Sequence, residues 1–91
     1  MTYEHITLTL DGAYATVTMN RPERRNALSL AHMQELTHTF AHIGQTDALG
    51  ITVAGNGPVF CAGHDFADMV GASLKDMRRL LRQCVLMMDT I

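Results

Sequence analysis

Apolar and polar residues alternate in two short stretches at the start of the chain. The apolar positions are Ile6, Leu8 and Leu10, then Ala13, Ala15 and Val17. A period of two is typical of a β-strand with one buried face, and Asp11-Gly12 between the runs is a strong hairpin signal. We therefore expect strands at about 4–10 and 13–19, joined by a tight turn with positive φ at both central residues.

From residue 29 the apolar spacing changes to three and four residues, the period of an amphipathic helix. Ser29 is a suitable N-cap, and Gly44 is a suitable left-handed residue after the last turn. The pattern predicts a helix over 30–43, with a stripe of Leu30, Met33, Leu36, Phe40 and Ile43. A second helix is predicted from the capping-box-like Ser73-x-x-Asp76 to the last residue, with a stripe of Met77, Leu80, Leu81, Cys84, Met87, Met88 and Ile91.

Shorter elements are predicted between the two helices. Leu49, Ile51 and Val53 indicate a buried strand that ends at Gly55-Asn56-Gly57-Pro58. A short extended piece is expected at Val59-Phe60 and a brief helix over 65–70. A hairpin followed by a helix and another strand is typical of the α/β class.

The chain has 91 residues, enough for one domain or part of one. No Gly, Asn or Pro ends the last predicted helix, and its apolar stripe still runs at Ile91. We therefore expect residues 1–91 to be the amino-terminal part of a single domain, cut within a helix.

Charge and composition narrow the function classes. A net charge of −2 argues against a nucleic-acid-binding protein, although basic residues cluster at 21–25 and 75–82 and leave room for a small anionic ligand. The first residues lack the basic start and the apolar run of a signal peptide. No stretch approaches the roughly 20 apolar residues of a membrane helix. Cys61 and Cys84 form no CxxC pair, so we expect reduced thiols and a cytoplasmic protein.

Two loops, each after a predicted strand, carry candidate chemistry. The loop over 20–28 holds three arginines, and a guanidinium can donate two hydrogen bonds to a phosphate. The loop over 57–65 places the His64 N–H at the start of the short predicted helix, where it could donate to an oxygen gaining negative charge. Taken alone, each loop fits ordinary structure better, as solvated arginines and a glycine-containing turn.

Several histidines and cysteines have both a functional and a plain interpretation. His32, His38 and His42 share one helix, but no HExxH pattern or cysteine set completes a zinc site, so we expect solvent-facing rings and no metal. The His64 imidazole is a candidate general base and Cys61 a candidate nucleophile, but we favour a bystander ring and an inert thiol.

The acidic residues offer little for proton transfer. Glu23 lies in an arginine-rich loop, and Glu35 is expected on the polar side of its helix. Asp65 is either a ligand contact or a cap of the short helix, and we favour the cap.

In this order and at this separation the two loops resemble those of the crotonase superfamily, which includes enoyl-CoA hydratases and isomerases. The matching segments are Asn20-Arg21-Pro22, Asn26-Ala27-Leu28, Gly55-x-Gly57 and Phe60-Cys61-Ala62-Gly63-His64-Asp65, with Met69 further on. The resemblance extends over nearly all 91 residues and implies a crotonase-like (ββα-type) α/β fold.

The resemblance implies that the ligand is an acyl-CoA thioester, with coenzyme A as part of the substrate and no permanently bound cofactor. By position, Arg24 or Arg25 would meet a CoA phosphate and the Ala62 carbonyl would accept from the adenine amino group. The His64 N–H would donate to the thioester oxygen. The full set of positions along the ligand would be Arg24, Arg25, Ala27, Leu28, Ala62, His64, Asp65 and Phe66.

Histidine at position 64 departs from the small or apolar residues common there, and it would narrow or polarise the acyl pocket. The family's second oxyanion donor and its acidic residues lie further along than Ile91, so we expect the 91-residue piece to be nearly inactive alone. The favoured function is a hydratase/isomerase-type enzyme of fatty acid metabolism that stabilises an enolate, and family analogy implies a homotrimer or a dimer of trimers. The alternatives are a non-catalytic acyl-CoA binder, another crotonase reaction such as hydrolysis, decarboxylation or dehalogenation, and a module that assembles with a partner through its last helix.

Overall fold

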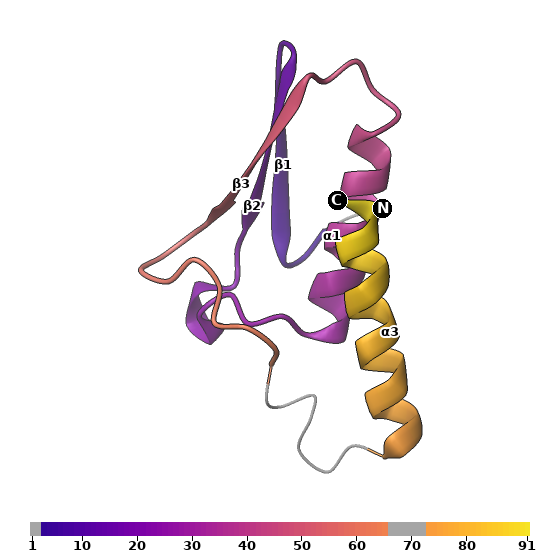
Figure 1. The fold of residues 1–91 in the computed structure, drawn as a ribbon. Helices are drawn as coiled ribbons and strands as arrows, with labels where there is room; N and C mark the ends of the chain where they lie inside the picture. Colours follow the sequence, from indigo (N-terminus) through magenta and orange to yellow (C-terminus); the bar gives the residue numbers. More distant parts are fainter. Residues whose placement is uncertain (1–2, 66–72) are drawn as a thin grey trace.

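The computed structural model describes residues 3–65 and 73–91, which form a three-stranded sheet packed beside two long helices (Figure 1). The elements are β1 (Ile6–Asp11), β2 (Tyr14–Met19), the 3₁₀ turn η1 (Pro22–Arg24), α1 (Leu30–Ile43), β3 (Gly50–Gly55) and α3 (Leu74–Thr90). The α/β class predicted from the sequence is confirmed. Apart from its first residue, the short helix predicted over 65–70 lies outside the described residues.

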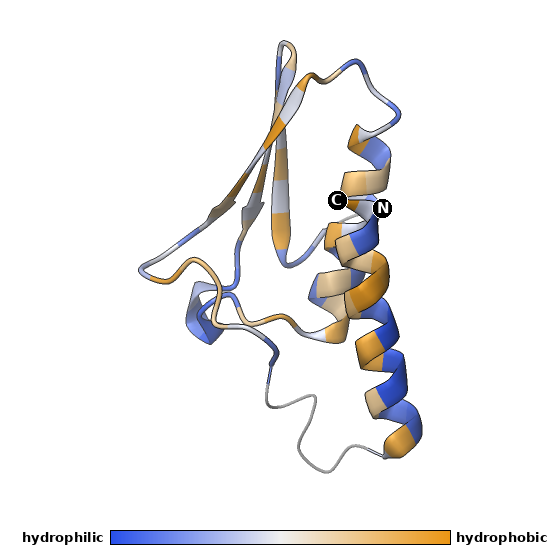
Figure 2. Cartoon of the chain, viewed as in Figure 1, coloured by the Kyte–Doolittle hydropathy of each residue, from blue (hydrophilic) through white to orange (hydrophobic). Residues whose placement is uncertain are grey.

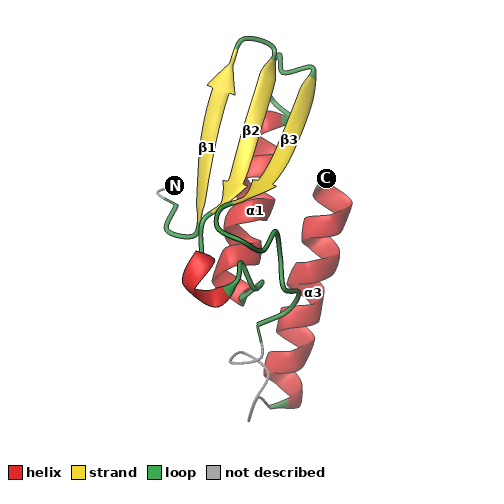
Figure 3. Cartoon of the chain, turned by 90° about the vertical axis from the view of Figure 1, so that its left-hand side faces the viewer, coloured by secondary structure: helices red, strands yellow, loops and turns green. Residues whose placement is uncertain are grey.

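The central strand of the sheet is β2, which pairs antiparallel with β1 and parallel with β3 (Figure 3). The hairpin turn lies one residue later than predicted, because Asp11 pairs with Tyr14 and leaves Gly12 and Ala13 as the central residues. Gly12 has a φ of 61°, whereas Ala13 is not among the positive-φ residues. Positive φ at the first central position alone, occupied by glycine, is typical of a type II′ turn.

Helix α1 begins and ends at the predicted residues. The Ser29 hydroxyl accepts a hydrogen bond from the His32 N–H at 3.1 Å, which confirms the N-cap. Met33, Phe40 and the rest of the predicted stripe face the core. The left-handed residue predicted at the C-terminus is wrong, because Gly44 has a φ of −62° and its N–H donates to the Phe40 carbonyl.

The side of α1 next to the apolar stripe differs from the prediction. His32 and Glu35 were expected to face solvent, but both are buried, with His32 completely inaccessible. The chain segment before β1 crosses this side of the helix, and Glu35 accepts hydrogen bonds from the Glu4 and His5 N–H groups at 2.8 and 3.0 Å. The buried face of α1 is therefore wider than the apolar stripe in the sequence indicated.

Strand β3 forms close to where it was predicted, but it is not buried. Ile51 and Val53 are 42% and 39% exposed, although their β2 partners Ala15 and Val17 are fully buried. α1 packs against β1, and α3 packs against α1 rather than on β3 (Figures 1 and 3). The apolar face of β3 is consequently left uncovered in the described structure. The extended piece predicted at Val59-Phe60 is an irregular loop.

Helix α3 begins at the predicted cap, where the Ser73 hydroxyl accepts from the Asp76 N–H at 3.1 Å. Of its apolar stripe, Leu80 and Met87 are buried, while Leu81 and Met88 are exposed. Apolar residues therefore remain visible along the outside of α3 (Figure 2). No helix in the described part of the chain is both long and apolar enough to cross a membrane.

Candidate functional site

The two loops singled out in the sequence meet around a cleft of about 520 Å³. A cleft of this size is within the usual range for small-molecule sites. Six of the eight predicted ligand positions line it, together with Val59, which the sequence did not indicate. The lining residues are Arg24, Arg25, Ala27, Val59, Ala62, His64 and Asp65. Leu28 does not line the cleft but packs against the core, and Phe66 is outside the described residues.

A short parallel bridge between Leu28 and His64 holds the two loops side by side. The Leu28 N–H donates to the Gly63 carbonyl at 2.7 Å, and the Asp65 N–H donates to the Leu28 carbonyl at 3.0 Å. In such a bridge the N–H of the middle residue points away from the partner strand. The His64 N–H is therefore not used by the bridge, and it has no acceptor among the described residues.

The turn before His64 requires glycine for conformational reasons. Gly63 has a φ of 92°, a region that residues with a side chain rarely adopt. A Cβ atom at this position would meet nothing within 4 Å, so lack of space is not the constraint. The Ala62 N–H donates to the Arg25 carbonyl at 3.1 Å, which ties the same turn to the first loop.

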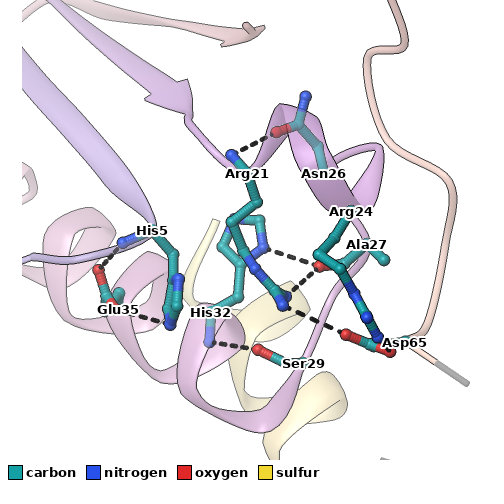
Figure 4. A network of polar contacts seen from close by, with 9 residues as sticks. All are labelled: His5, Arg21, Arg24, Asn26, Ala27, Ser29, His32, Glu35 and Asp65. Atoms are coloured by element: carbon teal, nitrogen blue, oxygen red, sulfur yellow. Dashed lines mark hydrogen bonds and ion pairs between the residues drawn. The ribbon is translucent and has the colours of Figure 1, made fainter. Parts of the chain in front are cut away.

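Asn26 joins the loops from behind the cleft. Its side chain is fully buried, and its Nδ2 donates to the backbone carbonyls of Asn56 and Val59 at 2.8 Å each. Its Oδ1 accepts from the Arg21 N–H at 2.7 Å (Figure 4). Sequence reasoning did not assign Asn26 this role. Its φ of 55° suits asparagine, but such tolerance in a loop does not identify a structural centre.

Two arginines of the first loop bind Asp65 of the second (Figure 4). Arg24 Nη2 lies 3.0 Å from Asp65 Oδ1, and Arg21 Nη2 lies 3.3 Å from Oδ2. The Asp65 side chain is 5% exposed, so its charge is buried with two compensating guanidiniums. The helix cap favoured for Asp65 involves residues outside the described part of the chain. Arg25, by contrast, makes no ion pair within the described residues, which leaves its charge available to a ligand.

The first loop is also held from α1. His32 Nδ1 lies 3.1 Å from the Ala27 carbonyl, which also accepts from Arg21 Nη1 at 2.8 Å. Because a carbonyl can only accept, His32 Nδ1 carries the hydrogen. Burial is the main reason that the pKa of His32 is lowered from 6.5, and the nearby Arg21 charge acts in the same direction. This histidine therefore positions the loop as a neutral donor.

The His64 side chain contacts a residue of α3. Its Nε2 lies 3.8 Å from the Cys84 sulfur, and both residues are half-buried. Its Nδ1 is buried without a hydrogen-bond partner in the described structure. Among the same residues no group of three potential ligands suits a metal ion, and His38 and His42 are exposed.

Comparison with known proteins identifies the fold and its family. The sequence profile of the enoyl-CoA hydratase/isomerase family matches residues 10–86. The chain belongs to this family. It is 40% identical over 62 residues to a probable enoyl-CoA hydratase, echA6, of Mycobacterium bovis, covering 68% of this chain and 26% of that protein. It is 38% identical over 61 residues to the mitochondrial enoyl-CoA hydratase domain-containing protein 3 of Rattus norvegicus, covering 66% and 20%.

Solved structures of the family have the same fold. An enoyl-CoA hydratase of Mycobacterium smegmatis superposes with a TM-score of 0.92 at 29% identity, covering 98% of this chain and 36% of that one. AtuE of Pseudomonas aeruginosa superposes with a TM-score of 0.88 at 31% identity, covering 96% and 35%. The crotonase-like fold is therefore confirmed. The chain spans about a third or less of the length of these relatives.

Proposed function

We propose that this enoyl-CoA hydratase/isomerase family member binds an acyl-CoA thioester in the cleft, with the thioester oxygen accepting from the His64 N–H. The observation that carries the proposal is this amide, which has no acceptor in the described structure and belongs to a residue lining the arginine-bearing cleft. A donor fixed in advance stabilises the negative charge that develops on the oxygen when an enolate forms.

Arg25 is the proposed phosphate contact. Its guanidinium is exposed at the cleft and unpaired within the described residues, whereas Arg24 is engaged by Asp65. An arginine free of carboxylates can donate two parallel hydrogen bonds to a phosphate without first losing an ion pair. These contacts therefore favour Arg25 over Arg24 for the CoA end of the ligand.

The reaction class proposed for the whole protein is of hydratase or isomerase type. One oxyanion donor contributes about 3–4 kcal/mol to lowering the barrier, and the reaction also needs a proton-transfer group at the α- or β-carbon. Asp65, the carboxylate in the described cleft lining, is engaged by Arg21 and Arg24. We propose that the second donor and the proton-transfer groups come from outside these 91 residues, so that the chain alone is nearly inactive.

The proposal is tested by comparing two ligands that differ only at the thioester carbonyl. Butyryl-CoA offers a thioester oxygen, whereas S-butyl-CoA has a methylene in place of the carbonyl. In ¹⁵N-resolved spectra of the chain, both should perturb the Arg25 region, but only butyryl-CoA should shift the His64 amide strongly downfield. An equal His64 response to both ligands, or none to either, would contradict the proposed hydrogen bond.

The same ion pairs favour a second candidate, a non-catalytic acyl-CoA binder. With the cleft carboxylate held by two arginines, the described cleft lining provides binding groups but no unpaired carboxylate. An assay of crotonyl-CoA hydration separates the two candidates. Hydration is measured as the decrease in the ultraviolet absorbance of the enoyl thioester. The assay uses the full-length protein, because the 91-residue chain is expected to be nearly inactive under either candidate. Turnover by the full-length protein supports the enzyme, and tight butyryl-CoA binding without turnover supports the binder.

A further inference from the structure

The contact between His64 and Cys84 brings a base and a nucleophile together beside the proposed thioester site. Cys84 Sγ lies 3.8 Å from His64 Nε2, within hydrogen-bonding range for sulfur. His64 is one of the residues that line the cleft, and its ring contacts the thiol on α3. A thiol hydrogen-bonded to an imidazole is the arrangement that activates nucleophilic cysteines.

The second ring nitrogen of His64, Nδ1, decides which tautomer of the ring can accept a proton from Cys84. Nδ1 of His64 is buried and has no acceptor or donor among the described residues, so no protein group there imposes a tautomer. With the hydrogen on Nδ1, Nε2 is free to accept the Cys84 proton. The ring can therefore serve as the base for the thiol without breaking another hydrogen bond.

We propose that Cys84 and His64 form a nucleophilic site for α,β-unsaturated acyl thioesters, in which the Cys84 sulfur adds to the β-carbon. Cys84 gives its proton to His64 Nε2 as a carbon–sulfur bond forms and the carbon–carbon double bond breaks. The electron pair moves to the thioester oxygen, and the resulting enolate then takes a proton at the α-carbon, returning the imidazole to its neutral form. The thioester itself stays intact, and no further reactant is consumed.

The arrangement of the two side chains favours the β-carbon over the carbonyl carbon. An oxygen bound to the His64 N–H places the carbonyl carbon next to the backbone, whereas Cys84 lies beyond the far side of the imidazole. The β-carbon of an extended enoyl group is two bonds further from the carbonyl oxygen and can approach the sulfur along the ring. This inference rests on the proposed function, because the N–H that holds the thioester oxygen also stabilises the enolate.

The second cysteine provides a matched control. Cys61 is half-buried, like Cys84, and precedes the same turn, but no histidine contact to it is present in the described structure. The two thiols therefore differ in whether an imidazole contacts them. An electrophile that reacted with any accessible thiol would label both cysteines. Selective reaction at Cys84 is the specific expectation.

The test is to incubate the 91-residue chain with crotonyl-CoA and with the small crotonyl thioester of N-acetylcysteamine, and to map the adducts by mass spectrometry. We expect a mass gain of the whole thioester on Cys84, no adduct in Cys84→Ser, and wild-type labelling of Cys84 in Cys61→Ser. His64→Ala keeps the backbone N–H but removes the base, so labelling should slow on the order of a hundredfold. Circular dichroism spectra check that each variant remains folded.

Three results would overturn the inference: labelling mainly at Cys61, no thioester adduct at Cys84, or a mass gain of the acyl group alone. Unchanged labelling of Cys84 in a folded His64→Ala would remove the role of the imidazole. Binding of saturated butyryl-CoA tests the proposed function separately. If butyryl-CoA binds but Cys84 is not labelled, only this inference fails; if the small thioester labels Cys84 but butyryl-CoA does not bind, the acyl-CoA proposal fails.

Discussion

The side-chain amide of Asn26 donates to the backbone carbonyl of Val59 at 2.8 Å, which fixes the first cleft loop against the second. The same nitrogen reaches the Asn56 carbonyl, and no part of the residue is accessible to solvent. A buried polar group therefore helps to hold the two cleft loops together. Buried polar groups that are fully paired hold backbone segments in one arrangement, because the unpaired alternatives are costly.

Replacing Asn26 by glycine should destabilise the chain by about 3 kcal/mol, because two backbone carbonyls and one N–H lose their buried partner. Glycine is chosen because it tolerates the φ of 55° and so isolates the loss of the side chain. Urea unfolding measures the change. Gln45→Ala, at an exposed position, should stay within about 0.5 kcal/mol of wild type, and equal losses in both variants would contradict the interpretation.

Asp65→Asn should lower the free energy of unfolding by roughly 3 kcal/mol, because it leaves the Arg21 and Arg24 charges without their shared carboxylate. Thermal unfolding at low ionic strength measures the effect. The control is Asp47→Asn, which removes an exposed charge and should change stability little. A loss no larger than that of the control would mean that the ion pairs contribute nothing to holding the loops.

The pH dependence of stability should include a contribution from His32. Its pKa is lowered in the folded chain, mainly by burial, so the unfolded chain binds this proton first as pH falls. The contribution is complete above the ordinary value of 6.5 and is lost as pH drops toward the lowered pKa. His5, Glu35 and Arg21 also face this ring and set part of the local field.

The contribution of His32 is measured by urea unfolding of the wild type and of His32→Asn between pH 8 and pH 5. Asparagine retains an N–H donor near the Ala27 carbonyl but does not titrate in this range. We expect the variant to lose less stability on acidification than the wild type, while His42→Asn, at an exposed position, follows the wild type. A steeper acid loss in His32→Asn would contradict the assignment.

Arg25→Gln should weaken CoA binding by about tenfold, because a charge-assisted hydrogen bond to a phosphate contributes roughly 1.5 kcal/mol or more. Arg24→Gln should weaken it less, because Arg24 is already paired with Asp65. Calorimetric titration with CoA and with dephospho-CoA measures both affinities. The reverse order of the two variants would place the phosphate at Arg24.

Sequence reasoning was most successful where the signal is local. The hairpin, α1, α3 and the Ser29 and Ser73 caps follow from periodicity and from a hydroxyl placed three residues before a free N–H. The resemblance of the loops to the crotonase superfamily also led to six of the residues that line the cleft. The hairpin turn and the residue after α1 were wrong in detail, because several turn types satisfy the same residues.

What the tertiary structure alone decided was the partners of the side chains. The sequence could not show that Glu35 meets the Glu4 N–H, that Asp65 is shared by two arginines, or that His64 reaches Cys84. Nor could it show that Ile51 is left exposed on a strand of apolar pattern. The pattern of a segment determines which face it offers, because side-chain direction follows from local backbone geometry. Burial and charge pairing depend on which distant segment covers that face, and that depends on the packing of the whole fold.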